Sequence, residues 1–393
     1  MITAATRPVQ RPADAKLLVV HASGRIDHTP RISWIDSLHP GDLVIANDAA
    51  TLPASLRGTH SPTGRAIEVR LAGRRSLARA DVHEFQAIVF GDGDFHTRTE
   101  DRPLPPPLLI GDHLDIGPLR AIVRARLGHP RLVSLGFIGT ADAVWAGIAR
   151  HGRPIQYAHV AEPLALWDVW TVIAGPPVAF EAPSAGFVLD WHTLDALRAR
   201  HIEFATLTHA AGISSTGDPT LDARLPFDEP YHIPHSTASA ISSAQADGRR
   251  IVAVGTTVVR ALEHAAGADG VVRPGAGLAD QRIGPHTPLR VVRAILSGVH
   301  EPDTSHYQLL RAFTDDETLQ ATLTEMAARD YRTHEFGDSV LIEAARGRLL
   351  AERHSLVSNA TTTDACQAEA RRVCHRAKAG RHEDEHEEET LSF

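Results

Sequence analysis

The stretch VAVGTTVVRALE, residues Val252–Glu263, decides the fold class of this chain. Together with Ile251 it predicts a short apolar strand, a turn at Gly255 and a helix that begins near Thr256. Such a unit places backbone N–H groups and hydroxyls at the carboxyl end of a strand, where open α/β sheets bind ligands. The helix N-terminus favours a carboxylate or a phosphate. A plain glycine turn with a threonine N-cap fits the same residues, so a ligand site does not follow from them alone.

Strands and helices alternate on both sides of this unit, which predicts an α/β domain with a mostly parallel sheet. We assign residues 1–56 and 150–345 to this domain. A helix is predicted at Ser236–Asp247 with Ser236 as its N-cap, and another at Asp315–Ala328 capped by Asp315 or Thr314. The other predicted elements are strands at Leu17–His21, Asp42–Ala46 and Glu203–Thr208 and a helix at Thr193–Arg200.

The segment 57–149 has a different pattern. It is broken into short alternating pieces, AIEVRLAG, EFQAIVFG and LDIGPLRAIVRARL, with glycine and proline between them. Short strands at this spacing predict a small β-barrel or sandwich. We therefore expect a β-barrel-like domain inserted into the α/β domain.

The composition is that of a globular protein, with 43% hydrophobic and 22% charged residues among 393. No apolar h-region opens the chain, and no apolar run approaches the ~20 residues that cross a bilayer, so we predict a cytoplasmic protein without membrane contact. Both cysteines, Cys366 and Cys374, lie near the C-terminus, so the folded part cannot rest on disulfides.

The formal net charge of −8 gives no support for an RNA-binding surface. Much of it lies in the terminal run HEDEHEEETLSF, without which the chain is close to neutral. Residues 346–393 lack sustained apolar periodicity, and we expect a charged, largely disordered tail. The sequence does not predict the oligomeric state.

The tail also contains two patterns that resemble metal sites. His382–His386 matches H-E-x-x-H but lacks an apolar helix face that would hold it. Cys366, Cys374 and His375 lack the short paired spacing of a structural zinc site. We therefore predict no metal.

Three further loops are candidate ligand contacts. Glu181–Gly186 is a run of small residues that lets a ligand approach the backbone closely. Val299–Ser305 places His300, a possible general base, before a helix. Asp338 follows Gly337 and precedes an apolar strand, where it could face the site or cap a turn. Each of these loops also fits a purely structural role.

Taken together, these units occur in the order of the S-adenosylmethionine:tRNA ribosyltransferase-isomerase family of queuosine biosynthesis, which the sequence resembles over roughly residues 15–342. The similar blocks are Pro40-Gly41-Asp42, Asn47-Asp48, Leu52–Gly58, Thr63-Gly64-Arg65, Trp170–Ala174, Ala182–Gly186, Ala205–Gly212, Gly255-Thr256-Thr257, His300 with Pro302, Tyr331-Arg332 and Gly337-Asp338.

The resemblance implies transfer of the ribosyl group of S-adenosylmethionine, as co-substrate, to a 7-aminomethyl-7-deazaguanine in tRNA. The products would be epoxyqueuosine in the tRNA, adenine and methionine. Such chemistry needs a base that removes an acidified proton beside the sulfonium and an acid that assists adenine departure. Because a sulfonium is already a good leaving group, no metal is required.

The same resemblance assigns residues to the site. Catalytic roles are predicted for His209, His300 and Asp338. Substrate-binding roles are predicted for Asn47, Asp48, Arg57, Pro183, Ser184, Ala185, Gly186, Gly212, Gly255, Thr256, Thr257, Arg260, Pro302, Thr304, Ser305 and Tyr331.

The chain departs from the family pattern in loops that would line the site. Phe187-Val188-Leu189 and Pro226–Glu229 both lack a histidine that the family usually carries, and Arg293 stands where an aspartate is usual. The alternative is therefore an S-adenosylmethionine-using transferase or lyase with a small-molecule acceptor. A third possibility is a nucleotide- or RNA-binding relative without catalysis.

Overall fold

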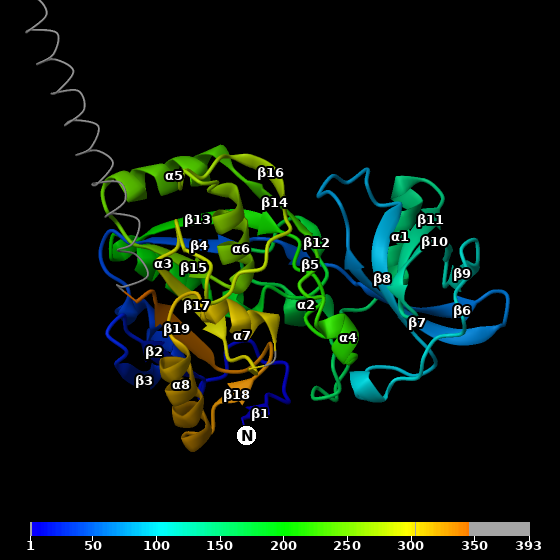
Figure 1. Cartoon of the computed structure of the whole chain (residues 1–393), viewed down its shortest axis with the longest axis horizontal. Helices are drawn as coiled ribbons and strands as arrows, with labels where there is room; N and C mark the ends of the chain where they lie inside the picture. Colours follow the sequence, from blue (N-terminus) through cyan, green and yellow to red (C-terminus); the bar gives the residue numbers. More distant parts are fainter. Residues whose placement is uncertain (1, 303, 346–393) are drawn as a thin grey trace, which may run out of the picture. The chain divides into compact units, whose positions relative to one another are not determined.

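The computed structural model describes residues 2–302 and 304–345, and the largest sheet among them is a nine-stranded mixed sheet (Figure 1). Four neighbouring pairs are parallel, among them the three that join β13, β4, β15 and β17, and four are antiparallel. In spatial order the strands are β16 (Gly275–Ala279), β14 (Glu229–Ile233), β13 (Glu203–His209), β4 (Leu43–Asn47), β15 (Ile251–Val254), β17 (Ala294–Gly298), β19 (Ser339–Glu343), β2 (Lys16–Val20) and β3 (Ile26–Pro30).

The central strands are buried on both faces, which explains their continuous apolar sequences. Every residue of β4 and of β15 is buried. Because β4, β15 and β17 run parallel, their carboxyl ends lie at one edge of the sheet. This edge carries the site described below.

Helices cover the sheet. Val44, Val252 and Leu296 pack with Trp34 and Leu197 in one apolar cluster, so the turn η1 and the helix α3 cover one face. The helices α5 and α6 contact β4 and β13 from the other face. The strand residues between those of the first cluster point toward that face, because successive side chains of a strand alternate. The helical segments are η1 (Arg31–Ser37), α1 (Ala141–His151), α2 (Leu166–Val169), η3 (Ser184–Val188), α3 (Trp191–Ala199), α4 (Pro219–Asp222), α5 (His235–Ala246), α6 (Thr256–Ala265), α7 (Ser305–Leu310) and α8 (Asp316–Ala328).

Six antiparallel strands close into a barrel, which confirms the β-barrel expected for this segment. Phe85 lies at its core and meets Phe137 and Phe180 edge-on, at ring-centroid distances of 5.9 and 6.1 Å. The boundaries at residues 57 and 149 stay a prediction. In spatial order the strands are β10 (Leu119–His129), β11 (Leu132–Ile138), β8 (Glu84–Phe90), β7 (Arg65–Gly73), β6 (Ser55–His60) and β9 (His113–Ile116), with the short turn η2 (Thr99–Asp101) between β8 and β9.

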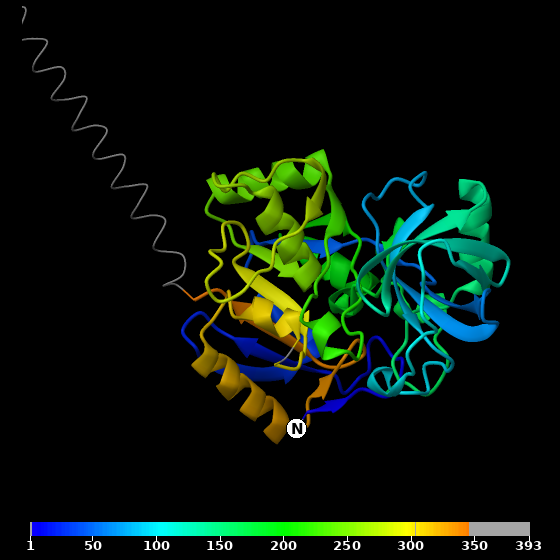
Figure 2. The same ribbon diagram turned by 45° about the vertical axis from the view of Figure 1, so that its right-hand side comes forward.

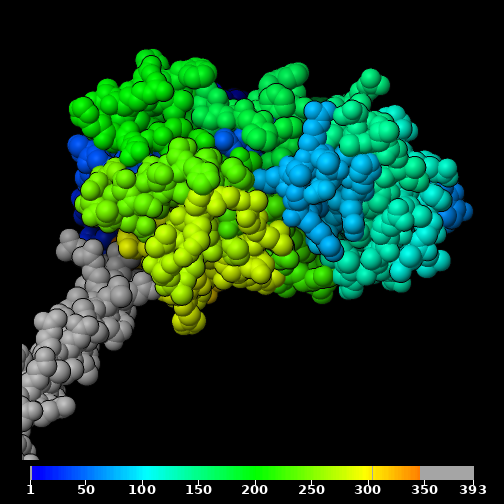
Figure 3. All heavy atoms as spheres, turned by 90° about the horizontal axis from the view of Figure 1, so that it is seen from above, coloured from blue at the N-terminus to red at the C-terminus, as the bar shows by residue number. Residues whose placement is uncertain are grey.

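Two short parallel pairs join distant parts of the chain. The N-terminal β1 (Thr3–Ala4) pairs with β18 (Arg332–Thr333), and the helix α8 contacts β2, as both ribbon views show (Figures 1 and 2). The strand β5 (Ala50–Thr51) pairs with β12 (Pro177–Ala179). The long connection after α6, yellow in Figure 3, lies on the surface.

The α/β fold class is confirmed, and the main predicted elements are found with ends that differ by one or two residues, as in α3, which begins at Trp191 rather than Thr193. One predicted N-cap is wrong. The helix α5 begins at His235, and its N-cap is Pro234, which makes no side-chain hydrogen bond to the helix. Ser236 is therefore not the N-cap, because the extended Pro234 leads directly from β14 into the first turn. The helix α8 begins as expected, with the Asp315 carboxylate accepting from the Thr318 N–H.

Within residues 2–302 and 304–345, no helix is long and apolar enough to cross a membrane. The predictions about the tail, including Cys366, Cys374, His375 and His382–His386, concern residues outside the described ranges.

Candidate active site

A cavity of about 630 Å³ opens at the carboxyl ends of β15 and β17. Its wall combines segments that are far apart in the sequence: residues 157–159, 181–185, 211–215, 254–257, 297–301 and 333–335, with further residues from 98–100 and 304–309. This is the edge at which parallel α/β sheets bind ligands. The unit Val252–Glu263 therefore contributes residues to the cavity wall. The sequence alone did not decide whether this unit forms a ligand site.

The N-terminus of α6 faces this cavity. Gly255 has a φ of 100° and provides no side-chain cap, and Thr256 and Thr257 line the wall. At this turn the Gly255 N–H donates to the carbonyl of Leu296 in the neighbouring strand β17, over 2.8 Å. A helix end without a side-chain cap presents its first N–H groups and the positive end of its dipole, which suit a carboxylate or a phosphate.

A buried ion pair lies one turn further along α6. The Arg260 guanidinium donates to the Glu229 carboxylate, whose other oxygen accepts from the Gly212 N–H over 2.6 Å. Burial raises the pKa of Glu229, and the adjacent Arg260 charge offsets part of that rise. Arg260 also donates to the Ala279 carbonyl over 2.8 Å, so the pair joins α6 to the strands β14 and β16.

Glu181 combines a cavity position with a strongly shifted pKa. Burial raises the pKa of this carboxyl to about 7, with a further contribution from the charge of Glu335. The Tyr157 hydroxyl donates to one carboxylate oxygen, and the Ser214 N–H donates to the other over 3.0 Å. A carboxyl with a pKa near neutrality can both accept and return a proton at physiological pH.

Two stacked histidines lie in the same wall. The rings of His300 and His306 are 4.7 Å apart with 19° between their planes, and Ser297 Oγ lies 3.0 Å from His300 Nε2. Burial lowers the pKa of His300 well below its usual value and lowers that of His306 to about 4. Both rings are therefore neutral at pH 7, and the lowered pKa makes His300 a weaker base than a free imidazole.

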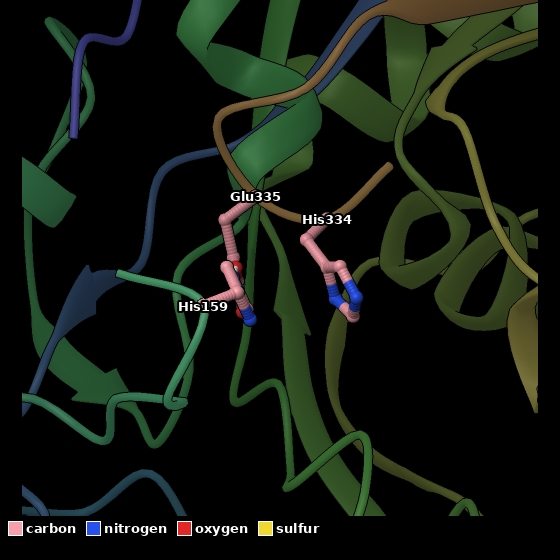
Figure 4. A group of neighbouring side chains, drawn as sticks. All are labelled: His159, His334 and Glu335. Atoms are coloured by element: carbon pink, nitrogen blue, oxygen red, sulfur yellow. Dashed lines mark hydrogen bonds and ion pairs between the residues drawn. The ribbon is translucent and has the colours of Figure 1, made fainter. Parts of the chain in front are cut away.

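A third group consists of His159, His334 and Glu335 (Figure 4). The His159 and His334 rings stack at 4.2 Å, and His159 Nε2 lies 3.3 Å from a Glu335 carboxylate oxygen. Burial opposes ionisation of Glu335, yet the hydrogen bond from His159 and the two imidazoles bring its pKa below the usual value. Two imidazoles and one carboxylate are ligand types that could hold a metal ion.

Most residues predicted for the site do line the cavity. They are His300, Pro183, Ser184, Ala185, Gly212, Gly255, Thr256, Thr257, Arg260, Thr304 and Ser305. Gly186 follows this wall directly within η3.

His209 lies behind the wall rather than in it. Its side chain is fully buried, and Nε2 lies 3.5 Å from the Glu229 carboxylate. Burial and the Arg260 charge lower its pKa, so the ring is neutral. Asn47 fixes its backbone, donating to the His209 carbonyl and accepting from the His209 N–H, each over 2.9 Å. The Asp48 carboxylate accepts from the hydroxyls of Thr206 and Thr208, which lie in β13 like His209.

The remaining predicted residues lie outside the cavity wall. Asp338 accepts from the backbone N–H groups of Lys16 and Arg332, over 2.6 and 2.8 Å, and so holds a loop in place. The Tyr331 hydroxyl bonds His28 over 2.9 Å. Arg57 projects from the barrel strand β6 and pairs with Asp94. Pro302 is the fourth residue of this group, and its carbonyl accepts from the Gln308 side chain over 3.1 Å.

Sequence reasoning missed Tyr157, His159, His334 and Glu335, and it included Glu181 only as the first residue of a candidate ligand-contact loop. Glu181 could have been singled out, because it directly precedes the small-residue run Ala182–Gly186. The two histidines and Glu335 carry no local signal, since they become neighbours only in the folded chain.

Comparison with known proteins gives a consistent result. Residues 2–342 match a family model described as queuosine biosynthesis protein. Three relatives named S-adenosylmethionine:tRNA ribosyltransferase-isomerase come from Methylobacterium sp. (strain 4-46), Geobacter sulfurreducens and Symbiobacterium thermophilum. They are 33%, 31% and 30% identical to this chain; the alignments cover 88%, 85% and 86% of it and 96%, 94% and 95% of the respective relatives. A solved structure of an S-adenosylmethionine tRNA ribosyltransferase from Thermotoga maritima is 24% identical, with a TM-score of 0.46 over 86% of this chain and 96% of that one.

Proposed function

Since the chain belongs to the queuosine biosynthesis protein family, we propose that it is an S-adenosylmethionine:tRNA ribosyltransferase-isomerase. It transfers the ribosyl group of S-adenosylmethionine to a 7-aminomethyl-7-deazaguanine in tRNA, and adenine and methionine leave. The small-molecule acceptor considered above is not favoured, because relatives named for tRNA resemble the chain over 85–89% of its length. We also propose that the protein is cytoplasmic, because tRNA is modified there.

The observation that carries the proposal is the uncapped N-terminus of α6 in the cavity wall. The methionine carboxylate of S-adenosylmethionine is the anion that this helix end would bind, through the first-turn N–H groups and the Thr256 and Thr257 hydroxyls. The run Pro183–Ala185 brings backbone close to the same point, since a Cβ on Gly255 would lie 3.4 Å from the Ala185 Cβ. The Arg260–Glu229 pair fixes the helix that offers this site.

We assign the proton transfers to Glu181. In its ionised form it removes the proton acidified by the adjacent sulfonium, and in its protonated form it returns a proton to the departing adenine. A pKa of about 7 makes both forms available at physiological pH. The hydrogen bonds from Tyr157 and Ser214 hold the carboxylate in one orientation. We assign to His300, neutral and hydrogen-bonded to Ser297, a role in orienting the substrate.

The reaction as proposed runs without a metal, because the sulfonium is itself a good leaving group. Of the other predicted catalytic residues, we place His209 and Asp338 in supporting positions. His209 backs the Glu229–Arg260 pair, and Asp338 anchors the loop that carries His334 and Glu335.

The test is product release by the purified protein. It is incubated with S-adenosylmethionine and tRNA bearing the aminomethyl-deazaguanine, and adenine and methionine are followed. Matched tRNA with unmodified guanine is the control. We expect release only with the modified tRNA. Release that needs no RNA would favour a small-molecule acceptor, and binding of S-adenosylmethionine without turnover in any mixture would contradict enzymatic function.

A further inference from the structure

The cluster of His159, His334 and Glu335 takes no part in the proposed chemistry, yet it has the composition of a metal site. Each residue offers one ligand atom, and these three atoms lie within 4.8 Å of one another. His334 and Glu335 come from the loop between β18 and β19, whereas His159 comes from a segment about halfway along the chain. In Figure 4 the Glu335 side chain extends toward His159, and His334 stands beside them.

We propose that these three side chains bind a divalent transition-metal ion, with Zn²⁺ as the best match to two imidazoles and one carboxylate. Three protein ligands leave a fourth position, which faces the cavity because all three residues line it. A water molecule or a donor atom of a bound ligand fills that position. None of the three ligands takes part in the proton transfers assigned to Glu181, so this inference goes beyond the proposed function, although a bound cation would offset the Glu335 charge that helps to raise the pKa of Glu181.

The loop that supplies two of the ligands is already held in place, as a metal site requires. Asp338 anchors its far end by two backbone hydrogen bonds. Arg31 donates to the Gly337 carbonyl over 2.7 Å. A Cβ on Gly337 would lie 2.4 Å from the Arg332 carbonyl oxygen, so only glycine fits the close approach there.

His334 itself has a φ of 69°, a left-handed conformation that costs a non-glycine residue free energy. Strained residues of this kind concentrate at functional sites, where the surrounding structure enforces them. Here the strain directs an exposed imidazole toward His159 and Glu335.

Binding of the ion changes one feature of the cluster. The His159 and His334 planes are 22° from parallel, and two stacked rings cannot both point a nitrogen lone pair at one ion. We expect the exposed His334 ring to rotate, which breaks the stack and forms the metal bond. The bound ion then joins the segment at His159 to the β18–β19 loop and stabilises this side of the cavity.

The test is titration of the full chain with Zn²⁺ and with Co²⁺, followed by calorimetry and by the visible absorption of the cobalt complex. Cys366, Cys374, His375, His382 and His386 are first replaced by alanine, because these residues offer further metal ligands. We expect one tightly bound ion per chain, and a Tm that rises with Zn²⁺ concentration. A crystal of the zinc complex should show anomalous density between the three side chains.

The variants are H334A and E335Q, with H129A as a matched control. His129 contacts a single carboxylate, that of Asp218 at 3.1 Å, and so lies in a pair rather than in a cluster of three ligands. We expect affinity to fall by about 100-fold or more in H334A and in E335Q and to be kept in H129A. Far-UV circular dichroism and the metal-free Tm show that each variant folds. Equal affinity in all four proteins, or no tight binding in the parent, would overturn the proposal. None of these measurements needs tRNA or turnover, so failure here is separate from failure of the proposed function.

Discussion

At the scale of single residues, the environment of Glu181 decides its chemistry. An exposed glutamate is fully ionised at pH 7, but burial in the cavity wall raises the pKa of this one to about 7. Its two oxygens each accept one hydrogen bond, from Tyr157 and from Ser214. The arrangement favours a carboxyl that gains and loses a proton during each turnover.

Replacing this carboxyl by an amide tests that role. We expect E181Q to lower kcat by about 10²–10⁴-fold, because the amide cannot take up a proton, while the affinity for S-adenosylmethionine changes little. Single-turnover adenine release and equilibrium binding measure the two quantities. An unchanged kcat in E181Q would remove Glu181 from the mechanism.

The pH dependence follows from the same group. The base form of Glu181 must be present, so kcat/KM should rise with pH through an apparent pKa of about 7. The Tyr157 hydroxyl donates to the ionised carboxylate and lowers its pKa, so Y157F should move this limb to higher pH. The pH profiles of the parent and of Y157F are compared. A limb that moves to lower pH in Y157F, or stays in place, contradicts the assignment.

At the scale of elements, the turn from β15 into α6 depends on Gly255. Its φ of 100° is unfavourable for any residue with a Cβ, and the Cβ would also contact Ala185. We expect G255A to lower the free energy of unfolding by about 1–2 kcal/mol. It should also weaken S-adenosylmethionine binding, because the first turn of α6 moves. Urea denaturation and binding calorimetry measure these effects.

Gly248 provides the matched control for that substitution. It has a φ of 67° just past α5, and a Cβ there would meet nothing within 4 Å. G248A should therefore cost a similar free energy of unfolding without a change in S-adenosylmethionine affinity. Equal losses of affinity in G248A and G255A would show that the α6 turn has no special part in binding.

A second prediction at this scale concerns the loop between β18 and β19, which Asp338 holds in place. Asp338 accepts two backbone N–H groups, and an amide in its place would direct a donor at one of them. We expect D338N to lower the free energy of unfolding by about 1–3 kcal/mol while kcat of the folded enzyme changes only a few-fold. Chemical denaturation and turnover at a temperature where the variant is folded give both values. A 100-fold loss of kcat at unchanged stability would instead support a catalytic Asp338.

At the scale of the whole molecule, the barrel is stabilised by a buried charge network near its core. Glu68 pairs with Arg70 and Arg102, and all three side chains are at most 4% exposed. Burial opposes ionisation of Glu68, but the two guanidinium groups together hold its pKa below the usual value. Its contribution to stability is therefore present above the unfolded-state pKa of about 4.3 and is lost as pH falls below that value.

Removal of this carboxylate leaves two buried positive charges unpaired. We expect E68A to cost about 3–5 kcal/mol of unfolding free energy. R79A is the comparison, because Arg79 and its partner Asp142 are 78% and 85% exposed, and such pairs contribute about 0–1 kcal/mol. Thermal and urea denaturation rank the two variants. An E68A variant as stable as R79A would show that the barrel does not depend on the network.

The sequence predicted much of the fold because its signals are local. The strand–glycine–helix unit from Ile251 to Ala265 and the barrel strands follow from apolar periodicity and from glycine and proline positions. The start of α5 was misplaced, since a Ser-rich beginning suggested a cap where Pro234 leads directly into the helix. The first residue of a helix depends on the backbone conformation of the residues before it, and local composition does not predict that conformation well.

For the site, the sequence by itself determined the family, the cavity segments Pro183–Ala185 and Gly255–Thr257, and the position of His300. Only the tertiary structure decided which groups meet there. It brought Tyr157 to Glu181 and His159 to Glu335, and it placed Asp338 outside the cavity wall. The physical reason is that contact, burial and pKa depend on groups distant in the chain, which the strand order of the sheet brings together.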